Sequence, residues 1–200
     1  MKEKKWLSIL AFGAAALSKE TTLIFWAAYM LFVLLQRQWR WFMALGLAPL
    51  PFFLYQLFLW QWLGAFGVGS GGAGATSFSL MPLGGWFSIA SVSWAAFWLI
   101  SLVVVPMSVL PSLAGIWVSV RRLRLTKVDP ITLSLFLNSL ILLFLPESTF
   151  REPIAMLRLN MGLVATLLIF GALSRSKRML TYNLLWLVTN ILLIKGVSGQ

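Results

Sequence analysis

Few residues in this sequence can do chemistry, and their types limit what that chemistry is. The chain has 200 residues, with five acidic side chains, no cysteine and no histidine. Thiolate and imidazole metal sites, cysteine nucleophiles and the serine–histidine–aspartate triad are therefore excluded. Only carboxylate and carbonyl oxygens remain as metal ligands, which suits Mg²⁺, Mn²⁺ or Ca²⁺. No pattern indicates such an ion, and no cofactor is predicted.

Lys19 and Glu20 form the first candidate site, because they interrupt the otherwise largely apolar stretch 6–35. Charges are costly in hydrocarbon and normally face a cavity or each other. One interpretation is a cation that binds an anionic ligand, with Glu20 as its partner or as a base. The other is a turn at the membrane surface, where both side chains reach water. The sequence fits both interpretations.

Arg151 and Arg158 form the second candidate site, at the start of a predicted helix. Pro153, preceded by Glu152, is a typical first helical residue. Arg158 then lies about 8 Å into the helix, and Arg151 shares its face if the helix extends back. Two guanidinium groups beside a helix N-terminus suit a phosphate or pyrophosphate. The alternative is that Glu147 or Glu152 neutralises Arg158 and no ligand binds.

The stretch Gly67–Gly72 matches the pattern G-x-G-x-x-G, but its surroundings do not suit a dinucleotide. Such a site needs a preceding strand, a following helix and an acidic residue about 20 positions later. Here a predicted membrane segment precedes it, and the next acidic residue is Asp129. We expect the glycine-rich stretch 64–85 to be a flexible outer loop that covers a cavity, or a plain linker.

The composition indicates the environment in which these side chains are positioned. Hydrophobic residues make up 60% of the chain, charged residues make up 10%, and the mean hydropathy is +0.90. A soluble domain carries about 25% charged residues, so the sequence predicts an integral membrane protein with membrane lipids as partners. The net charge of +11 is typical of basic cytoplasmic loops, and no nucleic-acid partner is predicted.

Seven apolar segments predict an all-α integral membrane protein with about seven transmembrane helices in a single polytopic domain, residues 1–200. The segments are Trp6–Ser18, Thr22–Leu35, Trp41–Leu63, Ser91–Val120, Ile131–Leu145, Ile154–Leu173 and Leu180–Ile194. A full crossing needs about 20 residues, which the third, fourth and sixth segments provide. The fifth and seventh are short. Pro106 and Pro111 are expected to kink or break the fourth segment.

Basic clusters at residues 2–5, 37–40, 121–127 and 175–178 predict the orientation of the chain. The positive-inside rule places all four in the cytoplasm, with a cytoplasmic N-terminus, in a plasma or inner membrane. This path requires the stretch 6–35 to form a short N-terminal hairpin. The alternatives are one long tilted helix and a signal peptide. The outer connections are then the Lys19–Glu20 turn and the stretches 64–85 and 146–153.

Three stretches are similar to parts of one enzyme family: Leu17–Thr21 between two apolar segments, Phe78–Pro82, and Phe150–Leu159. Together with the glycine-rich stretch, they make the chain resemble the GT-C class of integral-membrane glycosyltransferases over most of its length. That class uses polyprenyl-phosphate-linked sugars, and the likeness is to bacterial members described as glycosyltransferase-like membrane proteins. The resemblance implies a donor site that opens to the outer leaflet, with the lipid phosphate bound by basic residues.

Site residues follow partly from the resemblance and partly from chemistry. Lys19 matches the family's lysine in this helix pair. Arg151 and Arg158 are added because guanidinium groups bind phosphate, and Glu20 and Glu152 are supporting candidates. The expected ligand is therefore a lipid-linked sugar donor.

The chain departs from the family at its N-terminus. GT-C enzymes carry a catalytic Asp or Glu in a large first outer loop, whereas only a short basic stretch precedes Trp6 here. The chain therefore looks like the C-terminal half of such a protein without its own catalytic acid. An N-terminal-half polypeptide or a larger membrane complex is an expected partner. The alternative function is a non-catalytic structural subunit of a larger membrane complex, and a transporter is disfavoured by the few intramembrane polar groups.

Overall fold

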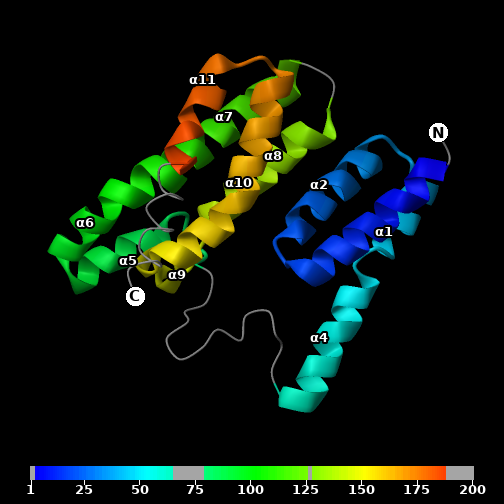
Figure 1. Cartoon of the computed structure of the whole chain (residues 1–200), viewed down its shortest axis with the longest axis horizontal. Helices are drawn as coiled ribbons and strands as arrows, with labels where there is room; N and C mark the ends of the chain where they lie inside the picture. Colours follow the sequence, from blue (N-terminus) through cyan, green and yellow to red (C-terminus); the bar gives the residue numbers. More distant parts are fainter. Residues whose placement is uncertain (1–2, 65–78, 126–127, 188–200) are drawn as a thin grey trace.

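The computed structural model describes residues 3–64, 79–125 and 128–187, and every regular element within these ranges is a helix (Figure 1). In chain order the elements are α1 (Glu3–Ser18), α2 (Thr22–Leu35), α3 (Trp39–Gly46), α4 (Leu50–Leu63), α5 (Gly84–Val92), α6 (Trp94–Val104), the π-helical turn η1 (Val105–Val109), α7 (Leu110–Leu125), α8 (Pro130–Leu142), α9 (Glu147–Arg151), α10 (Pro153–Leu173) and α11 (Lys177–Tyr182). The predicted all-α class is confirmed.

Within the described residues, three helical stretches are long and apolar enough to cross a membrane: Trp39–Leu63, Trp94–Leu125 and Ala155–Leu173. They correspond to the third, fourth and sixth predicted segments. Three further apolar helices (Trp6–Ser18, Thr22–Leu35 and Pro130–Leu142) fall below the roughly 20 residues that a crossing needs. A membrane protein is therefore supported. The number seven stays a prediction, and residues 188–194 of the seventh segment lie outside the described residues.

Large apolar side chains on α6 are exposed on the surface. Trp98 is 65% exposed and Leu102 is 74% exposed. The same holds on α4, where Phe58 and Trp62 are exposed. Soluble monomers rarely expose such contiguous apolar patches, so these faces suit contact with lipid.

The first two helices are separate, because α1 ends at Ser18 and α2 begins at Thr22. The backbone N–H of Lys19 still donates to the carbonyl of Ala15, and that of Thr22 donates to the carbonyl of Lys19, both at 3.0 Å. These bonds form a tight turn at Lys19 and Glu20. The predicted N-terminal hairpin is thus confirmed, and the alternative of one long helix is wrong.

The fourth predicted segment is divided at Ser93 and continues through its prolines. Ser93 has an extended backbone (φ −159°, ψ 118°), and its hydroxyl accepts a hydrogen bond from the backbone N–H of Ala96 at the start of α6. Further on, Pro106 has no N–H to donate to the preceding turn, and the helix widens into η1 rather than ending. The hydroxyl of Tyr182 donates to the carbonyl of Pro106. The expected disturbance is therefore a π-helical turn, and Pro111 lies buried within α7.

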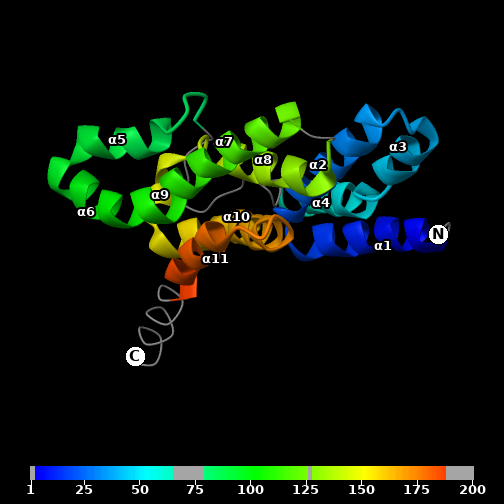
Figure 2. The same cartoon turned by 90° about the horizontal axis from the view of Figure 1, so that it is seen from above.

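Helix α8 lies among α7, α2 and α10 (Figure 2). Small residues allow these helices to approach closely. A Cβ atom on Gly115 of α7 would overlap the hydroxyl of Ser139 on α8, and one on Gly162 of α10 would overlap the side-chain oxygen of Asn138. The core around these contacts contains fully buried leucines such as Leu135. Sequence segments that are far apart are thereby held in one bundle.

Candidate functional site

Lys19 lies at the turn between α1 and α2, and its side chain reaches α10. The ammonium nitrogen donates a hydrogen bond to the backbone carbonyl oxygen of Arg158, with a distance of 2.9 Å. The side chain of Lys19 is half-buried. The structure therefore brings together two candidate residues that are separated by 139 positions in the sequence.

Arg158 is five residues beyond Pro153, or about 8 Å along α10. It is exposed, and it lies within the apolar stretch Ala155–Leu173. Its backbone carbonyl is occupied by Lys19, whereas the guanidinium group takes part in neither ion pair found among the described residues. The Lys19 ammonium is thus held at the backbone of Arg158, near the start of α10.

Arg151 is arranged differently from the prediction. Its guanidinium forms an ion pair with Glu147 one helical turn earlier in α9. Glu152 has a non-helical backbone (φ −104°, ψ 105°), so α9 ends before α10 begins. The helix does not extend back through Arg151, and the condition for a face shared with Arg158 is not met. Among the candidate cations, Arg151 is therefore the one whose guanidinium is paired with a carboxylate.

The two supporting carboxylates, Glu20 and Glu152, are both exposed. Neither belongs to an ion pair within the part of the chain that the structure describes. The same part contains no group of three carboxylates placed to hold a metal ion. The glycine-rich stretch Gly67–Gly72 lies outside the described residues.

A second cationic region, which the sequence suggested only as a topology signal, lies at the other end of α10. The end of α7 and the α10–α11 turn come together at the top of Figure 1. Arg121 and Arg178 line one cavity of about 500 Å³ between them. A second cavity of about 460 Å³ lies along α7 and is lined by Arg121 and Arg124.

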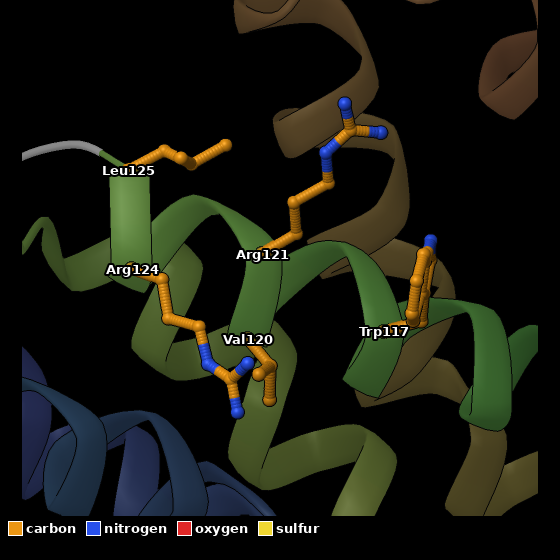
Figure 3. A pocket seen from close by; sticks show the side chains of 5 residues that line it. All are labelled: Trp117, Val120, Arg121, Arg124 and Leu125. Carbon is orange, nitrogen blue, oxygen red and sulfur yellow. The ribbon is translucent and has the colours of Figure 1, made fainter.

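Figure 3 shows how the α7 side chains divide around this region. Trp117, Arg121 and Leu125 extend from one side of α7, while Val120 and Arg124 extend from the other. Spacings of four residues place side chains on one helical face, so the sequence could have shown this division. It could not show that α11 supplies Arg178 beside the first face.

Arg122 has a structural role in this region. Its Nε atom lies 3.4 Å from the carboxylate of Asp129, and its guanidinium carbon lies 4.8 Å from the ring centre of Phe170. Asp129 in turn accepts hydrogen bonds from the backbone N–H groups of Ile131 and Thr132 and so caps α8. Arg122 therefore joins α7 to α8 and α10.

In the part of the chain that the structure describes, the fold is all-α, with three helical stretches suited to crossing a membrane and a cationic region near each end of α10. No family model, no curated protein and no solved structure matches the chain. The likeness to GT-C glycosyltransferases therefore depends on the sequence motifs alone.

Proposed function

We propose that this chain is the membrane part of a glycosyltransferase-like protein, and that Lys19 and Arg158 bind the phosphate of a polyprenyl-phosphate-linked sugar. The observation that supports this most is the 2.9 Å hydrogen bond from Lys19 to the carbonyl of Arg158. It holds the lysine beside the backbone of Arg158, which lies near the start of the candidate span Ala155–Leu173. A cationic pair at this depth is costly unless an anion or a cavity accompanies it.

Both side chains keep donors that a phosphate would use. The lysine ammonium has three N–H groups, of which one is directed to the carbonyl of Arg158. The guanidinium of Arg158 has five, in a planar arrangement that binds two phosphate oxygens at once. In this proposal Arg151 makes at most a secondary contribution, because Glu147 already pairs with it.

The transfer step needs a base, and we propose that a partner polypeptide supplies it. Glu20 and Glu152 are the acidic residues nearest in sequence to the two cations, and both are exposed. The GT-C resemblance implies a catalytic acid in a first outer loop of an N-terminal half. The chain then contributes the phosphate site, and the partner contributes the acid.

Binding of polyprenyl phosphate and of the uncharged polyprenol of equal length, measured in detergent, tests the phosphate site. The variants are Lys19→Met, which keeps an apolar stem, Arg158→Gln and Arg158→Lys. Each neutral variant is expected to weaken polyprenyl-phosphate binding about tenfold to a hundredfold and to leave polyprenol binding unchanged. Arg158→Lys is expected to weaken it too, because an ammonium cannot make a bidentate contact.

Arg40→Gln is the matched control, since Arg40 is an exposed arginine on α3. It is expected to bind polyprenyl phosphate like the wild type. The alternative of a structural subunit predicts another outcome. Lys19→Met would then melt at a lower temperature with or without lipid, and Lys19→Met and Arg158→Gln would both bind polyprenyl phosphate like the wild type. That outcome would mean that Lys19 only ties the hairpin to α10.

A further inference from the structure

We propose that the region between α7 and α11 is a binding site for one anionic phospholipid, distinct from the polyprenyl-phosphate site. Two cavities of about 500 Å³ and 320 Å³ adjoin there. Both are lined by Val118, Arg178 and Met179, so they are neighbours, and together they are here called the α7–α11 groove. Its two halves differ in chemistry, and that difference identifies the ligand.

The wider half carries the positive charge. Arg121 projects into it from α7 and Arg178 lines it from α11, and both side chains are exposed. Neither takes part in the ion pairs found within the described ranges. Two guanidinium groups on different elements bracket a volume in which a phosphate diester could accept hydrogen bonds from both. Arg122 is not counted, because Asp129 and Phe170 already engage it.

The narrower half follows α7 away from Arg121. Arg178 and Tyr182 also line it, and its other lining residues are apolar. It is lined by residues such as Leu110, Ala114 and Leu167. From Val118 back to Leu110 the helix rises about 12 Å, which approaches the depth of one leaflet's hydrocarbon, about 15 Å. A phosphate ion alone would leave this half empty, whereas an acyl chain fills it. The combination therefore specifies a phospholipid rather than free phosphate.

Trp117 indicates the depth at which the charged half lies. It lines the wider cavity one turn before Arg121, and its side chain is 68% exposed. Tryptophan concentrates at the level of lipid headgroups, where its ring is apolar and its N–H meets water. Arg121 and Arg178 then lie where a phosphate would be. Basic pockets between helices at this level favour anionic over zwitterionic lipids.

The test compares phosphatidylglycerol with phosphatidylcholine of identical acyl chains, counted on the intact full-length protein by native mass spectrometry after release from mixed nanodiscs. The wild type is expected to retain phosphatidylglycerol preferentially. The double variant Arg121→Gln/Arg178→Gln is expected to lose that preference by on the order of tenfold or more. Arg40→Gln, from an exposed position on α3, is expected to keep it.

A second variant tests the apolar half without changing any charge. Ala114→Phe fills the narrower cavity and is expected to reduce retention of phosphatidylglycerol several-fold. Glycerophosphoglycerol, which has the same headgroup and no acyl chains, is expected to bind far more weakly than the lipid. Equal binding of the two, or a phosphatidylglycerol preference that survives in the double arginine variant, overturns the proposal.

The result is independent of the polyprenyl-phosphate site. The double arginine variant is expected to bind polyprenyl phosphate like the wild type, and Lys19→Met is expected to retain phosphatidylglycerol. Loss of phosphatidylglycerol preference in Lys19→Met as well would show that both lipids respond to overall charge, and the groove would not be a site.

Discussion

The two cationic regions at the ends of α10 use the same kinds of charge in different ways. Near the start of α10, Lys19 is half-buried and fixed by a hydrogen bond to the carbonyl of Arg158. Near its end, Arg121 and Arg178 are exposed around an open groove with an apolar half. About 24 Å of helix separates Arg158 from Ser174 in that groove.

The comparison shows two ways in which a charged side chain is held in place in a mostly apolar chain. The first region is a contact between two distant segments, and its depth follows from how the hairpin packs on the bundle. The second lies at helix ends, where Arg121 and Arg178 are exposed and belong to neither ion pair found among the described residues. Changes to packing should therefore affect the first region, and changes to charge or salt should affect the second.

We expect the largest effect from Gly85→Ala. This substitution disturbs the packing of α5 on the chain segment that leads through α9 into the start of α10, where the first region lies. A Cβ atom on Gly85 would overlap the carbonyl oxygen of Leu145 and lie 2.7 Å from the backbone nitrogen of Glu147. These are backbone atoms just before α9 and α10, so they cannot rotate away. We expect a loss of about 3 kcal/mol in the free energy of unfolding, measured by thermal or denaturant unfolding in detergent.

Gly46→Ala is the control for this substitution, because a Cβ there meets nothing within 4 Å. We expect Gly46→Ala to unfold like the wild type. In folded Gly85→Ala, polyprenyl-phosphate binding should fall while phosphatidylglycerol retention persists. Wild-type stability for Gly85→Ala would contradict the close packing of α5 on this connection.

The next effect is expected at the other end, from Asp129→Ala. The carboxylate caps α8 through the N–H groups of Ile131 and Thr132, at 3.1 and 2.9 Å, and pairs with Arg122. We expect Asp129→Ala to cost about 1–2 kcal/mol of unfolding free energy. Asp129→Asn keeps a capping oxygen but loses the half-exposed ion pair and the oxygen that accepts from the Thr132 hydroxyl, which should cost less than Asp129→Ala, about 1 kcal/mol.

Polyprenyl-phosphate binding is expected to stay unchanged in both Asp129 variants, since distant independent sites do not couple. An equal loss of stability in Asp129→Ala and Asp129→Asn would mean that the interactions of the second carboxylate oxygen with Arg122 and with the Thr132 hydroxyl, rather than the cap, stabilise this end.

Salt is expected to distinguish the regions without any mutation. Between about 0.1 M and 1 M ionic strength the Debye length falls from about 10 Å to about 3 Å. Exposed Arg121 and Arg178 should therefore lose about fivefold in affinity for phosphatidylglycerol, about 1 kcal/mol. Polyprenyl phosphate beside half-buried Lys19 should lose less. Titration of both lipids at the two salt concentrations measures this. An equal loss of affinity for both lipids would contradict the expected difference between the two regions.

The smallest effect is expected in the core between the regions. The hydroxyl of Ser139 is fully buried and has no hydrogen-bond partner among the described residues. Ser139→Ala removes an unsatisfied polar group and should raise the unfolding free energy by up to about 1 kcal/mol. Ser108→Ala is the matched comparison, since it removes a hydrogen bond to Asn160 and should lower stability. Destabilisation by Ser139→Ala would show that this hydroxyl has a partner after all. Neither variant should change the binding of either lipid.

The apolar pattern of the sequence was enough to place most of the helices. Thr22–Leu35 was predicted with the same bounds that the structure gives α2, and Ile154–Leu173 differs from α10 by one residue at its start. Long apolar runs bounded by charges and prolines leave a chain few other conformations. The sequence also predicted the break at Lys19 and Glu20, because one long helix would have placed the first two basic clusters on opposite sides of the membrane.

Pairings between distant residues could be decided only by the tertiary structure. The sequence supplied Arg151 and Arg158 as equals, yet the break at Glu152 separates them, and Arg151 pairs with Glu147. The sequence offered Lys19 an anionic ligand with Glu20 as its partner, whereas in the structure its ammonium donates to the carbonyl of Arg158. Arg121 and Arg178 belong to two separate basic clusters in the sequence, and only the tertiary structure places both along one groove. Composition and periodicity fix which segments are helical and apolar, because those properties are local. Which helix faces meet depends on small residues such as Gly115 and Gly162, whose partners lie elsewhere in the chain.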